Sequence, residues 1–370
     1  MNDFSGSTPA PPPDVPVIAT GVLARVDRGA ADVLLTGAST TAPDLPALGT
    51  GVDSDLGTDA RVRADLGARV LADAAADYQL QPVVGDDVRL VHLPEGRWLV
   101  DALLPRRTAI TRASVAPGSS HRQVLAANVD FVAVTEPVDA RPKPGRVERL
   151  LALAWESGAT PLVLLTKSDL AHDLDESTET VVASAPGVDV IVCSATTGEG
   201  VDVLAALLQP EVSIAFVGPS GAGKSSLVNA LAGGVVMDVG DVRSDHRGRH
   251  TTVHRELVVL PGGARVVDTP GLRSVGLTTT DALDQVFSDI EEYAASCRFG
   301  DCQHETEPGC GVTSAIEAGL LDERRLASWR KLQREAAWLE RRNDARKRAE
   351  ERARWKSLSK QMRNSPRTRH

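Results

Sequence analysis

The sequence predicts a multidomain α/β protein in which a small β-barrel comes first and a helical, metal-binding domain comes last. Three observations predict this architecture: alternating apolar segments before residue 115, a GxxxxGK[ST] loop between an apolar run and a helical run, and a cluster of Cys and His near residue 300. A chain of 370 residues is long enough for two or three domains, and an apolar content of 42% is enough for packed cores.

The N-terminal third of the chain predicts the barrel, which we place at residues 17–115. Segments that alternate or run apolar, with Gly and Asp turns between them, cover residues 20–35, 83–93, 97–104 and 108–114. Residues 37–79 are rich first in Gly, Asp and Thr and then in Ala. We therefore expect an insertion between barrel strands there, helical in its second half.

The barrel region is poor in aromatic side chains, because Trp98 and Tyr78 are its only Trp or Tyr. Stacking of bases on aromatic platforms is therefore not expected. An RNA contact here would read backbone and shape through Arg106, Arg107 and Arg112. A barrel that serves as a spacer or as a dock for protein remains an open alternative.

The compartment is predicted from what the sequence lacks and from its cysteines. Residues 1–16 are Pro-rich without the basic start and apolar core of a secretory signal, so we expect a disordered lead. No apolar stretch approaches the roughly 20 residues that a membrane helix needs. Of the four cysteines, three lie within 14 residues beside a histidine, which suits a metal site in a reducing compartment better than disulfides. We therefore expect a cytoplasmic monomer that contacts no membrane.

Residues 116–277 predict an α/β domain. Residues 129–134 read as its first strand and residues 146–156 as an amphipathic helix, and strands then alternate with helices as far as residue 272. This alternation is typical of a mostly parallel sheet with helices on both faces.

A phosphate-binding loop lies inside this domain, between a predicted strand at 212–217 and a predicted helix at 226–231. Its glycines let backbone N–H groups surround phosphates, and Lys224 reaches the terminal phosphates as a catalytic cation. The Ser225 hydroxyl is placed to hold Mg²⁺. The expected phosphate-binding residues are Gly218, Pro219, Ser220, Gly221, Ala222, Gly223, Lys224, Ser225 and Ser226.

A second apolar run, at 264–267, ends in the sequence Asp268-Thr269-Pro270-Gly271. Asp268 stands where a carboxylate completes the Mg²⁺ site, and the N–H of Gly271 can reach the γ-phosphate. Both residues are expected in the nucleotide site.

Two base-reading motifs precede the phosphate loop. The Asp169 carboxylate, in Thr166-Lys167-Ser168-Asp169, can accept from two N–H groups of guanine, and the backbone of Ser194-Ala195 can reach the base carbonyl. Predicted strands at 161–165 and 188–193 end at these motifs. Thr166 stands where such sites usually carry Asn, so we expect the side-chain brace to the phosphate loop to be shortened or lost.

The order of these motifs identifies the domain. An ordinary GTPase has its phosphate loop first and its base readers last, whereas here the base readers come first. A permuted connection is physically permissible because the natural termini of a domain usually lie close together. The sequence predicts a circularly permuted P-loop GTPase domain.

A compact cluster of Cys297, Cys302, His304 and Cys310 predicts a metal site at residues 278–340. Three thiolates and one imidazole saturate tetrahedral zinc, which indicates a structural site without an open position for catalysis. Three reduced cysteines beside a surface histidine are the alternative. Cys193 lies apart and is expected to be a buried apolar residue.

The charge of the chain is divided unevenly. Residues 341–370 hold twelve Lys or Arg and three Asp or Glu, a local net charge of +9, so the other 340 residues carry −18 of the total of −9. An acidic body with a basic tail is typical of a selective RNA contact, although a solvated helix end is the alternative. The expected RNA-binding residues are Arg346, Lys347, Arg348, Arg352, Arg354 and Lys356.

Taken together, the motifs resemble those of the ribosome small-subunit-dependent GTPase A family, from about residue 17 to the C-terminus. The likeness extends to Pro82-Val83-Val84-Gly85-Asp86, Ala127-Asn128-Val129-Asp130 and Gly248-Arg249-His250-Thr251-Thr252. The resemblance implies an OB-fold, a permuted GTPase domain and a zinc domain. It also implies a role late in the maturation of the small ribosomal subunit, with the tail on ribosomal RNA.

Leu272 follows Gly271, where many GTPases keep a Gln that orients the attacking water. Leucine cannot bind water, so we expect His250, in the Arg- and His-rich loop 243–254, to take this role; a solvated or RNA-facing histidine is the alternative. Thr251 or Thr252, with Thr252 preferred, should close on Mg²⁺. Intrinsic turnover should then be slow and a partner should accelerate it.

The leading hypothesis is a GTP-hydrolysing maturation or quality-control factor of the small ribosomal subunit, stimulated by that subunit. A zinc-dependent nucleic-acid regulator that senses GTP without stimulated turnover is a second, and a self-contained metabolic nucleotidase is a third. Stimulation of hydrolysis by small subunits separates the first hypothesis from both others.

Overall fold

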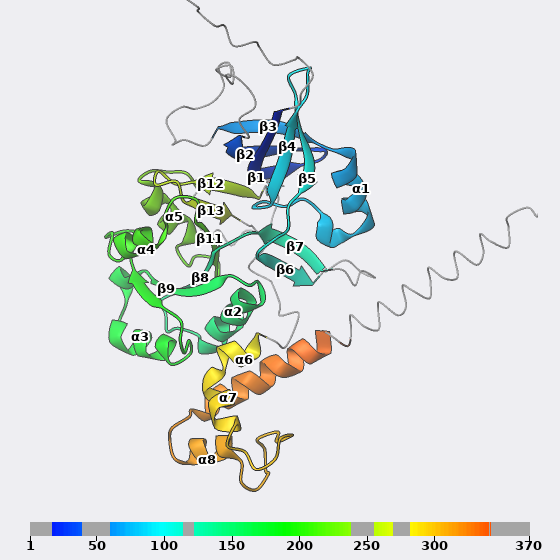
Figure 1. The fold of residues 1–370 in the computed structure, drawn as a ribbon. Helices are drawn as coiled ribbons and strands as arrows, with labels where there is room; N and C mark the ends of the chain where they lie inside the picture. Colours follow the sequence, from blue (N-terminus) through cyan, green and yellow to red (C-terminus); the bar gives the residue numbers. More distant parts are fainter. Residues whose placement is uncertain are drawn as a thin grey trace, which may run out of the picture.

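The computed structural model describes residues 17–38, 60–113, 122–237, 255–268, 282–339 and 341. A β-barrel, an α/β domain and a group of helices follow one another along the chain, with the α/β domain in the middle (Figure 1). Within the described residues, no helix is both long and apolar enough to cross a membrane.

The barrel is closed by five strands. Strand β1 pairs with β2 and with β4, β2 pairs with β3, and β5 joins β3 to β4, so the ring runs β1-β2-β3-β5-β4 and returns to β1. A helix lies between β3 and β4, which completes an OB-like arrangement. The elements are β1 (Val17–Asp27), β2 (Ala30–Ala38), β3 (Arg61–Leu66), α1 (Ala68–Ala76), η1 (Tyr78–Leu80), β4 (Asp87–His92) and β5 (Trp98–Leu103).

Two expectations about the barrel were wrong. Residues 61–66, which we placed inside an insertion at 37–79, form β3 and are needed to close the ring; of that insertion, residues 39–59 lie outside the described part. The expected barrel strand at 108–114 leaves the barrel: β6 (Ala109–Ala113) pairs with β7 (Arg122–Ala127) in a separate ribbon. Both segments were misassigned because the pattern of apolar residues does not determine which strands pair. Tertiary contacts determine the pairing.

The α/β domain has the mostly parallel sheet that the sequence predicts. Its strand order is β10-β9-β8-β11-β13-β12, and all neighbours are parallel except β12 and β13. One residue pair, Arg25 with Glu256, links β12 to β1 of the barrel. The strands are β8 (Phe131–Pro137), β9 (Thr160–Thr166), β10 (Val190–Cys193), β11 (Ser213–Val217), β12 (Glu256–Val259) and β13 (Arg265–Asp268).

Helices cover both faces of this sheet because its central strands are apolar on both sides. Leu164 and Phe216 share one core with Leu204 and Leu227, whereas Leu165 and its neighbours pack on the opposite face. The first core holds α4 (Val201–Leu207) and α5 (Lys224–Ala232), and the second holds α2 (Pro144–Glu156) and α3 (Leu174–Val182).

The C-terminal helices pack against α2. They are α6 (Leu283–Val286), α7 (Ser288–Ala294), α8 (Gly311–Glu317) and a helix at residues 323–339. Leu326, Trp329 and Leu332 belong to the same core as Val147 of α2, and Ala336 is also buried.

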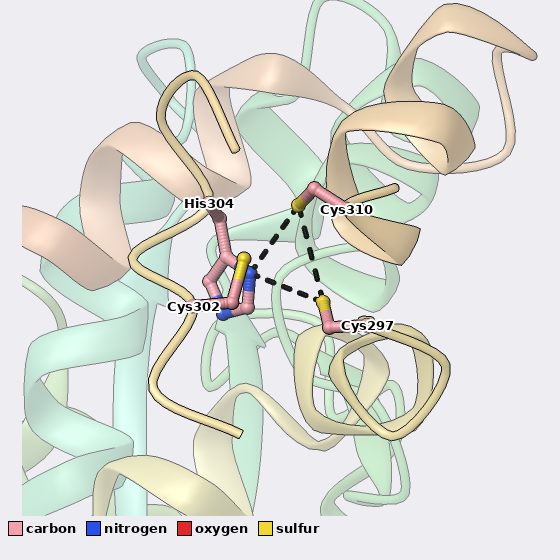
Figure 2. A group of neighbouring side chains, drawn as sticks. All are labelled: Cys297, Cys302, His304 and Cys310. Carbon is pink, nitrogen blue, oxygen red and sulfur yellow. Dashed lines mark hydrogen bonds between the residues drawn. The ribbon is translucent and has the colours of Figure 1, made fainter. Parts of the chain in front are cut away.

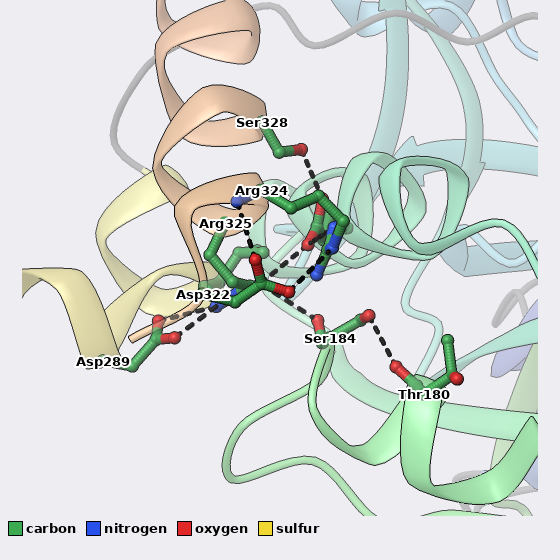
Figure 3. A network of polar contacts seen from close by, with 9 residues as sticks. Thr180, Ser184, Asp289, Asp322, Arg324, Arg325 and Ser328 are labelled. Carbon is green, nitrogen blue, oxygen red and sulfur yellow. Dashed lines mark hydrogen bonds and ion pairs between the residues drawn. The ribbon is translucent and has the colours of Figure 1, made fainter. Parts of the chain in front are cut away.

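A buried ionic network joins the same two parts (Figure 3). The carboxylate of Glu148, on α2, is fully buried and accepts from Arg324 at 2.9 Å, from Arg325 at 3.0 Å and from Ser328. Arg325 is itself 2% exposed and also donates to Asp289 at 2.6 Å. Charges this deeply buried need such partners, so the network fixes how the helices sit on α2.

The barrel is fixed to the α/β domain by the motifs at residues 82–86 and 127–130. Buried Asp86 accepts two hydrogen bonds from Arg106, and the Asn128 side chain accepts from the N–H of Arg107 and donates to the carbonyl of Gly85 at 3.0 Å. Gly85 has φ of +89°, and a Cβ there would lie 2.0 Å from the carbonyl oxygen of Ala127. These motifs are joints between domains.

The three arginines expected to contact RNA also make contacts within the protein. Arg106 pairs with Asp86, Arg107 pairs with Asp130 at 2.8 Å, and Arg112 donates to Gln123 at 2.9 Å. Arg106 and Arg107 thus stabilise the linker between barrel and sheet, and Arg112 stabilises the β6–β7 ribbon. A contact with RNA through these residues stays a prediction.

Candidate nucleotide and metal sites

The phosphate loop joins β11 to the first turn of α5 and begins at a glycine that the fold requires. Gly218 has φ of +155°, and a Cβ there would lie 2.1 Å from Oγ1 of buried Thr135 on β8. Thr135 Oγ1 also donates to the carbonyl of Val217 at 2.9 Å. No motif in the sequence marks Thr135, because its part in shaping the loop depends on the pairing of β8 with β11.

The loop ends at the N-terminus of α5, where unpaired backbone N–H groups and the helix dipole favour an anion. Gly223 precedes the helix in a left-handed conformation, and Ser225 and Ser226 lie in its first turn. The ammonium group of Lys224 turns back over the loop, 3.1 Å from the carbonyl oxygen of Gly218 and 2.6 Å from that of Pro219. The arrangement can cradle phosphates.

The two base-reading motifs lie side by side beside this loop. Strands β9 and β10 are parallel, with Thr166 opposite Cys193, so Lys167 and Ser194 leave neighbouring strands at the same edge of the sheet. Ser168 and Asp169 form the short helix η2 (Ser168–Leu170), and Ala195 follows Ser194. The cyclic shift in the sequence thus leaves one continuous site in space.

Thr166 keeps the brace to the phosphate loop that we expected to be shortened or lost. Its hydroxyl donates to the carbonyl of Ala222 at 2.8 Å, and the side chain is 1% exposed. The shorter side chain suffices because the end of β9 lies directly against the loop. Of the two expected outcomes, the brace is shortened but not lost.

Further residues support the base-reading loops. Asp169 Oδ1 accepts from Ser194 Oγ at 2.5 Å, and Glu199 Oε2 accepts from Ser168 Oγ at 2.6 Å. Lys167 pairs with Asp139, in the loop after β8, at 2.5 Å. Sequence reasoning missed Glu199 and Asp139, because neither belongs to a motif that reads the base.

Asp268 lies at the same edge of the sheet as the phosphate loop. It is the last residue of β13, which runs parallel to β11, the strand that leads into that loop. The remaining expected nucleotide residues, His250, Thr251, Thr252 and Gly271, lie outside the described residues, as does Leu272. The expected RNA-binding residues of the tail also lie outside.

The metal cluster comes together as predicted (Figure 2). The ligand atoms of Cys297, Cys302, His304 and Cys310 all lie within 4.8 Å of one another. Nδ1 of His304 is 3.6 Å from Cys297 Sγ and 3.5 Å from Cys310 Sγ, and the two sulfur atoms are 3.9 Å apart. Tetrahedral zinc, with bonds of about 2.0 to 2.3 Å, separates its ligand atoms by about 3.5 to 3.8 Å, so this donor set could hold one zinc ion.

Backbone N–H groups organise the cluster and its loop. The N–H of Gly311 points to Cys297 Sγ at 3.3 Å, a contact typical of metal-bound thiolates. In the loop between ligands, the N–H groups of Gln303 and Glu305 donate to the Glu307 carboxylate and lower its pKa to about 2.

Cys193 takes no part in the cluster and is fully buried on β10. Burial, with a smaller contribution from the charge of Glu199, raises the pKa of its thiol to about 12. A thiol that stays protonated is neither a ready nucleophile nor a ready metal ligand, which agrees with the apolar role expected for it.

An OB-like barrel, a P-loop domain with displaced base readers and a Cys₃His cluster together define a circularly permuted GTPase. The model of the RsgA GTPase family matches residues 103–278. The chain is 51% identical over 262 residues to the small ribosomal subunit biogenesis GTPase RsgA of Streptomyces coelicolor, covering 70% of this chain and 71% of that protein. It is 44% identical over 305 residues to the protein of the same name from Opitutus terrae, covering 78% and 82%. The chain therefore belongs to the RsgA GTPase family.

Solved structures share the fold. YjeQ from Thermotoga maritima aligns with a TM-score of 0.62 at 23% identity, covering 86% of this chain and 99% of that one. YloQ, described as a circularly permuted GTPase, aligns with a TM-score of 0.59 at 23% identity, covering 86% and 95%.

A family model of ABC transporters also matches residues 202–364. That range contains the phosphate loop, a motif common to many nucleotide-binding families. The base-reading motifs precede residue 202, so this match leaves out the residues that distinguish a GTPase.

Proposed function

We propose that this GTPase binds the small ribosomal subunit and hydrolyses GTP in its late maturation or quality control, with turnover stimulated by the subunit. The relatives described above are named for biogenesis of that subunit. One observation carries the nucleotide half of the proposal: Thr166, at the start of a base-reading motif, bonds to Ala222 of the phosphate loop, so both ends of a nucleotide can be met at once.

In the proposed site, Asp169 selects guanine and the Ser194-Ala195 backbone meets the base carbonyl. The phosphate loop and Lys224 hold the phosphates and neutralise the charge that develops in the transition state. Ser225, Asp268 and Thr252 would hold Mg²⁺, which would neutralise negative charge on the phosphates.

The zinc ion is proposed to be structural. Its four protein ligands leave no open position, and its binding would supply folding free energy to a small loop-rich unit. The basic tail is proposed to bind ribosomal RNA by its charge, and the protein is proposed to act as a cytoplasmic monomer.

The rate of GTP hydrolysis with and without purified small subunits tests this function. A large increase with small subunits, absent with large subunits at the same RNA concentration, is expected. Equal rates in all three conditions would favour the second hypothesis, a zinc-dependent regulator that senses GTP.

His250 is the proposed water-orienting residue, since Leu272 cannot bind water. His250→Ala should leave the affinities for GTP and for the subunit nearly unchanged but remove most subunit-stimulated hydrolysis, and the protein should remain on the subunit in its GTP form. Single-turnover hydrolysis and cosedimentation measure these effects, with His246→Ala in the same loop as the matched control. Stimulated turnover close to that of the unmodified protein would overturn the assignment.

A further inference from the structure

The two base-reading loops are joined by two side-chain hydrogen bonds that run in opposite directions. Ser168 Oγ, in the first loop, donates to Glu199 Oε2 in the second at 2.6 Å. Ser194 Oγ, in the second loop, donates to Asp169 Oδ1 in the first at 2.5 Å. Each loop thus contributes one serine and one carboxylate, and both bonds are strengthened by the charge of the acceptor.

The backbone fixes the position from which the Glu199 side chain reaches across. The N–H of Ser194 donates to the carbonyl of Glu199, and the N–H of Gly198 donates to the carbonyl of Ser194, both at 2.9 Å. Gly200 follows with φ of +67°, where a Cβ would lie 2.0 Å from the carbonyl oxygen of Val192. This closed turn holds Glu199 beside the first loop.

The two cross-loop bonds have different tasks. The bond from Ser194 orients Asp169, the carboxylate proposed to meet guanine. The bond between Ser168 and Glu199 involves neither that carboxylate nor the phosphate loop, so its effect is to fix the spacing of the two loops. We propose that Ser168 and Glu199 are positioning residues that hold the base-reading loops at the separation that guanine requires, and thereby set the preference for guanine.

Loss of the hydrogen bond between Ser168 and Glu199 should weaken only the contacts that the protein makes with the base. A carboxylate meets two donors at once only when it is held within about 0.5 Å of the right place. Without the Ser168–Glu199 hydrogen bond, which we call the clamp, the binding of GTP and of GDP should be weakened equally, because both present the same base. Inosine triphosphate (ITP) lacks the exocyclic amino group and offers only one donor to Asp169. The binding of ITP should therefore be weakened less than that of GTP. The ratio of GTP to ITP affinity should therefore fall.

The test compares Ser168→Ala, Glu199→Ala, the double variant and Glu199→Gln in the full-length protein. Affinities for GTP, GDP and ITP are measured at equilibrium, and release of ribose-labelled fluorescent GDP is followed by stopped flow. Each alanine variant should bind GTP and GDP about threefold to tenfold more weakly, through faster release. The double variant should be no weaker than either single one, because one bond is lost in all three.

Glu199→Gln should restore most of the affinity and the GTP to ITP ratio, because the amide oxygen still accepts from Ser168. Asp202→Ala, which removes an exposed acid from the first turn of the neighbouring helix α4, is the matched control and should bind like the unmodified protein. If Glu199→Gln binds GTP as weakly as Glu199→Ala does, while Ser168→Ala binds GTP normally, then Glu199 acts by its charge and the clamp is refuted.

The proposal rests on the proposed guanine site, so Asp169→Asn is measured in parallel. That variant should lose affinity for GTP and gain affinity for xanthosine triphosphate. Normal GTP binding by Asp169→Asn would overturn the site itself and the clamp with it. Weakened binding by Asp169→Asn together with an unchanged GTP to ITP ratio in both alanine variants would overturn the clamp alone.

Discussion

At residue 166 a hydroxyl makes the contact to the phosphate loop for which such sites usually carry an asparagine. The contact is possible because Thr166 ends a strand that lies against the loop, and its hydroxyl is 2.8 Å from the carbonyl oxygen of Ala222. The bond links the loop that reads the base to the loop that holds the phosphates. It therefore belongs to the binding machinery, although it touches neither end of the nucleotide.

Thr166→Val should weaken GTP and GDP binding by about threefold to tenfold, because the shape is kept while the buried carbonyl of Ala222 loses its side-chain donor. Thr166→Ser keeps the hydroxyl and is the matched control. Titration calorimetry with both nucleotides measures the effect. Unchanged affinity in the valine variant would show that the loop holds its shape without the brace.

At the scale of the elements, the fold of the loop at residues 297–310 is held mainly by its metal ligands and backbone N–H contacts, and less by apolar packing. Its ligands are gathered within 4.8 Å, and its turns are held by N–H groups that point to a sulfur atom and to the Glu307 carboxylate. So short a loop has little core of its own, and metal binding can supply the missing free energy.

Elemental analysis should find about one zinc ion per chain, and Cys302→Ser should lose it. Hydrogen exchange should then show reduced protection in residues 297–317, while GTP binding persists, because the nucleotide site lies on other elements. Cys193→Ser, which changes a cysteine outside the cluster, should retain zinc. An unchanged C-terminal fold in a zinc-free preparation would contradict a structural role.

Helix α2 is the platform on which the C-terminal helices are held. It contributes Glu148 to the buried network, and the neighbouring Arg149 pairs with Glu335 at 2.5 Å. Arg325 and its partner Glu148 are both buried, so the network is specific to one docking geometry.

Glu148→Gln should destabilise the protein by about 3 kcal/mol, because it leaves buried arginine charge without a full partner. Replacing both Glu148 and Arg325 by Met should recover part of that loss. Denaturant unfolding measures both, with Glu323→Gln, an exposed acid on the helix at 323–339, as control. A Glu148→Gln variant as stable as the control would show that apolar packing alone docks the helices.

At the scale of the whole molecule, the cyclic shift of motifs leaves the sheet intact. Strands β8, β9 and β10 precede β11 in the chain and lie on one side of it, and β12 and β13 follow it and lie on the other. Strand pairing fixes which neighbours meet, so the point at which the chain enters the sheet can move without displacing the site.

Replacing Arg346, Lys347, Arg348, Arg352 and Arg354 by neutral residues should weaken binding to small subunits and flatten its salt dependence. Each lost phosphate contact should remove about 0.7 to 0.9 from the slope of log affinity against log salt. Cosedimentation at several salt concentrations measures the slope, and intrinsic GTP hydrolysis should not change. An unchanged slope would mean that the basic tail is a solvated helix end.

The sequence by itself determined the features that are local or chemically explicit. The phosphate loop, the base-reading motifs, the Cys₃His cluster and the alternation of strands and helices are written in short stretches, where residue type and spacing carry the chemistry. The mostly parallel sheet followed from that alternation, and the cyclic shift from the order of the motifs.

The tertiary structure decided what depends on contacts between distant residues. It placed residues 61–66 in the barrel and residues 109–113 outside it, and it turned Arg106 toward buried Asp86. It also brought Glu199 to Ser168 across 31 positions of sequence. Such choices depend on which surfaces meet after folding, and residue spacing along the chain does not encode that.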